Sequence, residues 1–210
     1  MIGYLHGFLG APEVWGPVDG IALALPPIAP SWSANLAAIA ERLGPVEAVV
    51  GYSLGARLAL GLVVEGYVPR AVLISVNPGI SDMERPARRA ADAAWAARLR
   101  TEPLADVLDD WEAQPLFAGT SRADRRAQRL ALDAEQCARS LEVLGLAEMP
   151  DYRGEVDHRF RLIAGADDAK FVAIARALPA PLELIRGSGH DPTLDQPAAL
   201  RAAIDRALTA

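Results

Sequence analysis

The sequence lacks several features that mark whole classes of protein. Its single cysteine, Cys137, cannot form an intrachain disulfide. Its three histidines, His6, His158 and His190, lie far apart, so no cluster has the spacing of a structural zinc site. Basic residues are not in excess, because 21 lysines and arginines stand against 27 acidic residues and the formal net charge is −6. We therefore expect no disulfide framework, no metal and no nucleic-acid partner.

Long hydrophobic runs are missing as well. The longest stretch without a charge, residues 20–40, contains three prolines, two serines and an asparagine, which a membrane-spanning helix tolerates poorly. The chain does not open with a basic segment followed by an apolar core and a cleavage site. We expect no membrane span and no secretion signal, and the lone cysteine favours a cytoplasmic location.

What is present suits a compact enzyme-sized domain. The 210 residues, 51% of them hydrophobic, are enough for a sizeable core. Short apolar runs bounded by glycine and proline indicate buried strands at 2–5, 21–25, 46–50, 71–76, 160–164 and 182–185. Helical periodicity lies between most of them, at 33–43, 54–64, 168–178 and 196–208. This alternation predicts an α/β fold with a mostly parallel sheet and helices on both faces. We separately expect a monomer or small homo-oligomer.

The alternation stops between about residues 80 and 150. No strand-like run occurs there, and alanine, leucine, arginine and acidic residues recur at helical spacing. We therefore expect an α/β core formed by residues 1–79 and 151–210, with residues 80–150 as a helical cap insertion.

The clearest chemical motif is a G-x-S-x-G sequence. Gly51-Tyr52-Ser53-Leu54-Gly55 follows one expected strand and opens the next expected helix, which is the strand–turn–helix context of a nucleophile elbow. Small residues at 51 and 55 allow strand and helix to approach closely, and the helix N-terminus favours developing negative charge. The pattern predicts Ser53 as a reactive hydroxyl, against the alternative of a plain glycine-bounded turn.

Such a serine needs a base and an acid that orients it. His190 lies in a glycine-containing loop after the last expected strand, at the same sheet edge as Ser53, whereas His158 fits a surface position and His6 a structural one. The loop after the preceding strand supplies two neighbouring acids, Asp167 and Asp168. One of them is expected to cap the following helix, and spacing does not decide which.

These motifs resemble the α/β-hydrolase superfamily and, within it, the family of 2-succinyl-6-hydroxy-2,4-cyclohexadiene-1-carboxylate synthases. The resemblance runs over nearly the whole chain. Its marks are His6-Gly-Phe-Leu-Gly10 with Trp15, Gly51-Tyr-Ser-Leu-Gly-Ala-Arg57, Pro78-Gly79 followed by Arg85, Arg88, Asp92 and Trp95, Thr101-Glu-Pro-Leu104, Trp111, Gln114-Pro-Leu-Phe117, Gly165-Ala-Asp-Asp-Ala-Lys-Phe171 and Gly189-His190.

The resemblance implies a lyase that eliminates pyruvate from a polycarboxylate in menaquinone biosynthesis, without a cofactor. It implies Ser53, Asp168 and His190 as a triad in which Ser53 acts as a base. The amides of Phe8 and Leu54 would form the oxyanion hole, and the substrate contacts would be Tyr52, Arg57, Arg88 and Trp111. Because the chain starts close to its first strand, it would form a truncated six-stranded sheet of order 2-1-3-4-5-6.

The sequence also departs from that family. A further substrate-binding arginine of the family falls here on Leu132 or Asp133, with Arg129 nearby as a stand-in. An aspartate at that place would repel a carboxylate. A serine carboxylesterase or thioesterase acting on a small acidic acyl substrate is therefore the alternative function, and a ligand-binding protein that keeps only the fold is a third.

Overall fold

The computed structural model describes residues 1–118 and 125–209. Six strands form one sheet, namely β1 (Ile2–Leu5), β2 (Ile21–Leu23), β3 (Ala48–Tyr52), β4 (Ala71–Ile74), β5 (Phe160–Gly165) and β6 (Leu182–Ile185). All five pairings between neighbouring strands are parallel, and the order is β2-β1-β3-β4-β5-β6. The sheet order predicted from the sequence is thereby confirmed.

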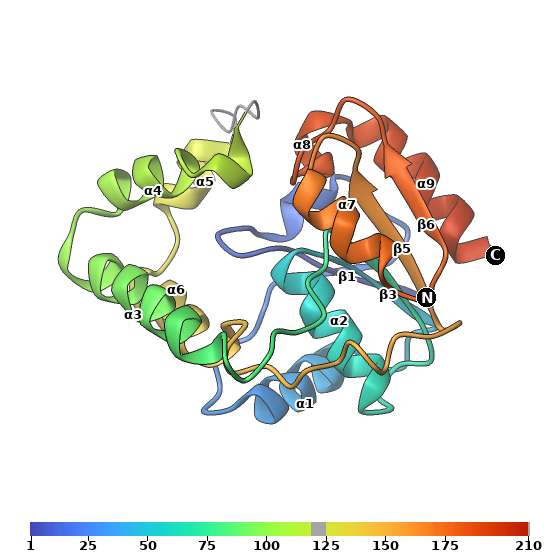
Figure 1. Ribbon diagram of the computed structural model, residues 1–210, viewed down its shortest axis with the longest axis horizontal. Coiled ribbons are helices and arrows are strands. Elements are labelled where there is room, and N and C mark those ends of the chain that lie inside the picture. The colour runs from blue at the N-terminus through green and yellow to red at the C-terminus, as the bar shows by residue number, and fades with distance from the viewer. Residues whose placement is uncertain (119–124, 210) are drawn as a thin grey trace.

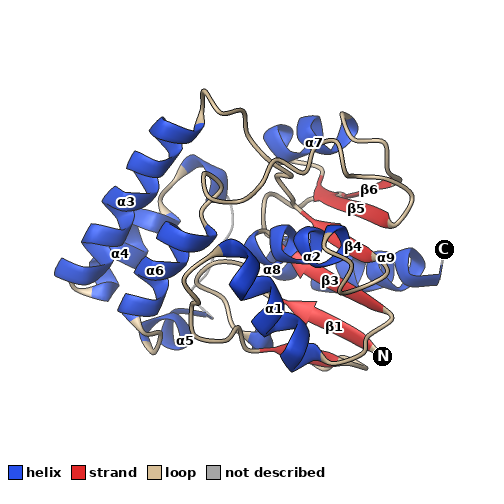
Figure 2. Ribbon diagram, turned by 90° about the horizontal axis from the view of Figure 1, so that it is seen from below, coloured by secondary structure: helices blue, strands red, loops and turns tan. Residues whose placement is uncertain are grey.

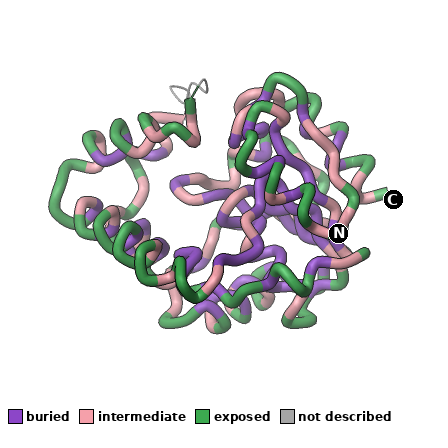
Figure 3. The backbone as a smooth tube through the Cα atoms, in the orientation of Figure 1, coloured by how far each residue is buried: buried purple, intermediate pink, exposed green. Residues whose placement is uncertain are grey.

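Helices cover both faces of this sheet. The helices of the α/β part are α1 (Trp32–Leu43), α2 (Leu54–Val64), α7 (Ala169–Arg176), α8 (Pro192–Asp195) and α9 (Pro197–Thr209), with a 3-10 turn η1 (Pro12–Trp15). Side chains alternate between the faces of a strand, so Val49 of β3 packs with α1 and α2 while Val50 packs with α9. Figure 3 shows burial concentrated in the sheet and the helices beside it.

Strand β3 lies two residues further along the chain than the predicted strand at 46–50. Its last two residues, Gly51 and Tyr52, pair with Leu73 and Ile74 of β4, so the motif's first glycine is still strand. The turn therefore begins at Ser53 itself. The helix predicted at 54–64 is present with those bounds.

The described part of the expected insertion consists of helices and the loops that join them, without a strand. Between β4 and β5 lie α3 (Arg85–Thr101), α4 (Leu104–Glu112), the 3-10 turn η2 (Pro115–Phe117), α5 (Arg126–Leu130) and α6 (Ala134–Leu144). These cap helices stand to one side of the sheet, at the ends of its strands, away from both chain termini (Figures 1 and 2). They have a small hydrophobic cluster of their own, which includes Leu99, Leu108 and Leu141. The domain boundaries at 79/80 and 150/151 stay a prediction, and residues 119–124 of the expected cap lie outside the described residues.

Candidate active site

Ser53 sits on a strained turn between β3 and α2. Its φ of 53° and ψ of −108° place a non-glycine residue in a region that costs of order 1–3 kcal/mol. The two motif glycines make the turn possible. A Cβ on Gly51 would lie 2.2 Å from the Gly55 carbonyl oxygen, and a Cβ on Gly55 would lie 2.1 Å from the Leu5 carbonyl oxygen. The backbone itself therefore excludes larger residues at both positions.

A hydrogen-bonded chain links the three residues predicted as a triad. The Ser53 Oγ lies 3.2 Å from His190 Nε2, and the His190 Nδ1 lies 2.9 Å from Asp168 Oδ2. His190 and Asp168 are both buried. A serine, an imidazole and a carboxylate in this order form the arrangement that activates a hydroxyl for proton transfer or nucleophilic attack.

Asp168 makes two contacts at once. Its Oδ1 accepts a hydrogen bond from the Phe171 amide at 3.1 Å, which caps α7, while its Oδ2 accepts from His190. Burial raises the pKa of Asp168, but the hydrogen bonds from His190 and the Phe171 amide outweigh it and hold the pKa below its usual value. Asp167 is exposed, and its backbone amide donates to the Ser188 carbonyl at 2.9 Å. Asp168 therefore both caps α7 and contacts His190, whereas the sequence argument gave one of these roles to each of the two aspartates.

The loop that carries His190 has supports that the sequence did not indicate. Ser75, directly after β4, donates from its hydroxyl to the His190 carbonyl at 3.0 Å and has a φ of 51°. Asp195 accepts from the Gly189 amide at 2.8 Å. Ser75 lies in a run that the hydrophobic pattern assigned to a strand, so only its polarity at the end of that run signalled another role.

The other two histidines are placed as predicted. His6 is buried, its Nδ1–H donates to the Gly7 carbonyl at 2.8 Å, and burial lowers its pKa. His158 is exposed.

The triad residues line a cavity of about 820 Å³ between the sheet edge and the cap helices. This volume is within the range of small-molecule sites. Phe8 and Leu54, the predicted oxyanion-hole residues, lie on its wall. Leu54 is the first residue of α2, where amides have no intrahelical acceptor. In the described part of the chain neither amide donates a hydrogen bond, so both can serve a ligand oxygen. The cavity is also lined by all four predicted substrate contacts, Tyr52, Arg57, Arg88 and Trp111.

Two arginines approach the cavity from opposite sides. Arg57 of α2 donates from Nη1 to the Leu144 carbonyl at 2.6 Å, and Arg88 of α3 donates from Nε to Asp92 Oδ2 at 2.8 Å. Burial and the nearby Arg88 guanidinium lower the pKa of Arg57 and the Asp92 carboxylate raises it, with a net value of about 9. Burial makes the positive charge on this wall costly, and a carboxylate ligand would relieve that cost.

Arg129 reaches the cavity although the family pattern points to the residues after it. Its side chain is buried, lines the cavity and pairs with Glu112. Its Nε has no hydrogen-bond partner among residues 1–118 and 125–209. Leu132 packs against the hydrophobic cluster of the cap, and Asp133 caps α6 by accepting from the amides of Glu135 and Gln136. The Asp133 carboxylate caps a helix and is not among the described residues of the cavity wall, so it does not repel a carboxylate ligand there.

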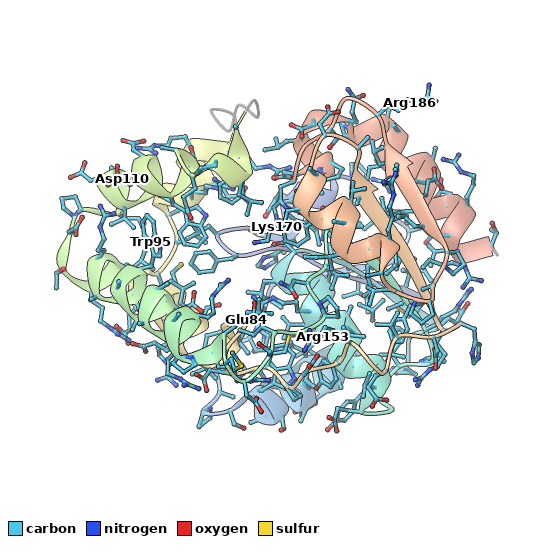
Figure 4. All side chains as sticks on the ribbon, in the orientation of Figure 1. Glu84, Trp95, Asp110, Arg153, Lys170 and Arg186 are labelled. Atoms are coloured by element: carbon cyan, nitrogen blue, oxygen red, sulfur yellow. The ribbon has the colours of Figure 1, made fainter. Side chains whose placement is uncertain are left out.

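Aromatic rings enclose the reacting groups. The ring centroid of Trp111 lies 4.9 Å from that of Phe8 and 5.0 Å from that of Trp95. Figure 4 shows Trp95 of α3 on the side of that helix that faces α4. Trp111 therefore packs within the cap and also lines the cavity. The ring of Phe171 lies 4.4 Å from His190 and that of Phe117 lies 5.9 Å from it.

Residues 1–118 and 125–209 contain neither a membrane-spanning helix nor a clustered metal site. No helix there is long and apolar enough to cross a bilayer. No group of three or more histidine, cysteine, aspartate or glutamate side chains in those residues is arranged to hold a metal ion.

Comparison with known proteins gives consistent matches. The model of the alpha/beta hydrolase family matches residues 4–203. A Klebsiella pneumoniae protein named 2-succinyl-6-hydroxy-2,4-cyclohexadiene-1-carboxylate synthase is 39% identical over 172 residues, covering 76% of this chain and 67% of that protein. A Salmonella heidelberg protein of the same name is 32% identical over 231 residues, covering 93% of this chain and 88% of that protein. The solved structure of MenH from S. aureus has a TM-score of 0.89 at 23% identity, covering 99% of this chain and 92% of that one.

Proposed function

The chain belongs to the alpha/beta hydrolase family and, within it, to the family of 2-succinyl-6-hydroxy-2,4-cyclohexadiene-1-carboxylate synthases, and we propose that it carries out their reaction. It eliminates pyruvate from 2-succinyl-5-enolpyruvyl-6-hydroxy-3-cyclohexene-1-carboxylate and leaves the conjugated diene. The observation that carries the proposal is the Asp168–His190–Ser53 chain on the wall of a cavity that also presents Arg57 and Arg88.

Ser53 starts the reaction as a base. His190 accepts the hydroxyl proton of Ser53, and Asp168 stabilises the resulting imidazolium. The serine oxygen then takes a proton from the substrate ring next to the succinyl carbonyl. The electron pair of the broken C–H bond forms a new ring double bond, the existing ring double bond shifts by one position, and the C–O bond to the enolpyruvyl group breaks. The enolate that leaves takes the proton held by the His190 imidazolium and becomes pyruvate, which restores the neutral imidazole. The chain's own residues supply every group in this sequence.

Charge appears on the succinyl carbonyl oxygen while the proton is removed. The amides of Phe8 and Leu54 are the donors assigned to that oxygen, and donors held ready for developing charge lower the barrier without reorganising. Arg57, Arg88 and Arg129 would bind carboxylates, since guanidinium groups hold them in bidentate fashion. Tyr52 and Trp111 supply the remaining contact surface.

The competing function is ester or thioester hydrolysis, because the same triad would let Ser53 attack an acyl carbonyl. A spectrophotometric assay with the cyclohexene substrate, run beside p-nitrophenyl esters, separates the two. We expect diene and pyruvate to form far faster than esters are cleaved, and Ser53→Ala to abolish the reaction. Ser33→Ala, on the exposed face of α1, is the matched control and should keep full activity. Ester cleavage without diene formation would overturn the lyase assignment.

The remaining attributes are part of the same proposal. We take the substrate to be a small polycarboxylate and not a nucleic acid, which the net charge of −6 supports. A cytoplasmic location, a monomeric or small homo-oligomeric state and the absence of a cofactor stay predictions.

A further inference from the structure

The arginines of the cavity differ in the partners they have. Arg88 and Arg129 belong to the cap, and each pairs with a carboxylate, Asp92 for the first and Glu112 for the second. Arg57 belongs to the core and donates to a backbone carbonyl. Among residues 1–118 and 125–209, no carboxylate forms an ion pair with Arg57. Arg57 therefore has no direct carboxylate partner among these residues, whereas the guanidinium of Arg88 is held by Asp92.

Asp92 is held firmly in place. Its side chain is only 7% exposed, and its Oδ2 lies 2.8 Å from the Nε of Arg88, one helical turn earlier on α3. On the other side it meets the backbone that follows α6, because a Cβ on Gly145 would lie 2.7 Å from the same oxygen. A carboxylate so enclosed has little freedom to rotate, and it fixes the direction of the guanidinium that it accepts from.

The contact with Asp92 uses only one part of the guanidinium. The group is a rigid planar fork with Nε on one edge and the two terminal nitrogens on another. In the described part of the chain, neither terminal nitrogen of Arg88 donates a hydrogen bond. Both remain able to bind a carboxylate, and Arg57 lines the same cavity.

We propose that Asp92 is a positioning residue of the substrate site. By accepting from Nε, it directs the terminal nitrogens of Arg88 into the cavity, where they and Arg57 hold one carboxylate group of the ligand from the cap side and the core side. The identity of that ligand rests on the proposed function, but the contact itself requires only a carboxylate.

A double-mutant cycle tests whether Asp92 acts through Arg88. We expect Asp92→Ala to raise KM about tenfold and to change kcat less than about threefold, because a charge-assisted contact to the ligand is misplaced while the triad is untouched. In an Arg88→Ala background, the same Asp92→Ala change should alter KM less than about twofold. Asp92→Asn should stay within about threefold of the wild type, because its amide oxygen accepts the same hydrogen bond.

The controls separate positioning from stability. Asp110→Ala removes an exposed cap carboxylate that pairs with Arg98 and should leave KM unchanged. Thermal unfolding of each variant monitors the fold, and Asp92→Ser replaces Asp92→Ala in the cycle if the latter does not fold. Equal KM changes in both backgrounds would show a structural role and overturn the proposal. A lower KM in Asp92→Ala would overturn it too, since Asp92 would then act by repelling the ligand.

The cycle also has a form that does not need turnover. If the wild type forms no diene, the proposed function fails, and succinate affinity is measured by calorimetry on the same four proteins. The same non-additive pattern would support the positioning role independently of the reaction. Additive effects, or no succinate binding by the wild type, would overturn it.

Discussion

Replacing Asp168 separates its two contacts, because serine and alanine differ in only one of them. Both substitutions remove the carboxylate partner of His190. Serine is a good N-cap and can still accept from the Phe171 amide, whereas alanine cannot. Loss of a cap costs about 1 kcal/mol, which for a domain of this size lowers Tm by about 2–4 °C. We expect Asp168→Ala to melt lower than Asp168→Ser by about that amount.

Activity should fall equally in both variants. Without the carboxylate the imidazole loses its tautomer and its orientation, a loss that costs about 10³- to 10⁴-fold in kcat where a triad carboxylate is replaced by a neutral group. The diene-forming assay measures kcat, and circular dichroism measures Tm. Asp167→Ala is the matched control and should stay within about threefold of the wild type. The reasoning is refuted if Asp168→Ser retains activity within tenfold of the wild type, or if the two Asp168 variants melt together.

Two further predictions concern the elbow and acid stability. Gly55→Ala forces a Cβ to within 2.1 Å of the Leu5 carbonyl oxygen, so denaturant unfolding should show that the free energy of unfolding falls by at least about 3 kcal/mol. Gly154→Ala, with open space around it, is the control and should change this free energy by no more than about 0.5 kcal/mol. Equal losses in the two variants would contradict the clash. The lowered pKa of Asp168 means that its ionised carboxylate stabilises the fold above its unfolded pKa of about 3.9. The advantage of the wild type over Asp168→Ala in free energy of unfolding should therefore shrink as the pH falls below about 4, and an advantage that grew on acidification would reverse the sign of the argument.

The parts of the site that lie on regular structure could be predicted from the sequence. Ser53 follows a strand and precedes a helix, and the hydrophobic periodicity and the glycines predict both elements. His190 could be assigned because the carboxyl ends of parallel strands gather at one edge of the sheet. The fold followed from the same alternation of strands and helices.

What the sequence did not reveal are contacts between segments far apart in the chain. The hydroxyl of Ser75 meets the carbonyl of His190 across 115 residues, and Gln136 and Arg139 of the cap bond the backbone of Ile28. Such pairings depend on how irregular loops and cap helices pack, for which neither periodicity nor spacing gives a signal. Arg129 could be named from the sequence only as a stand-in, because whether it reaches the cavity depends on where α5 lies.

Spacing alone left the choice between Asp167 and Asp168 open for a different reason. The sequence argument assigned one task to each residue, with one acid capping α7 and the other orienting the imidazole. A carboxylate has two oxygens, each with its own lone pairs, and at the first turn of a helix one oxygen can face the amides while the other faces away. Asp168 uses Oδ1 for the Phe171 amide and Oδ2 for His190. The cap thereby fixes the rotamer of the carboxylate, and a fixed carboxylate fixes the imidazole. The stability of α7 and the alignment of His190 therefore depend on the same carboxylate. A serine in place of Asp168 should preserve the stability of α7 but lose the alignment of His190.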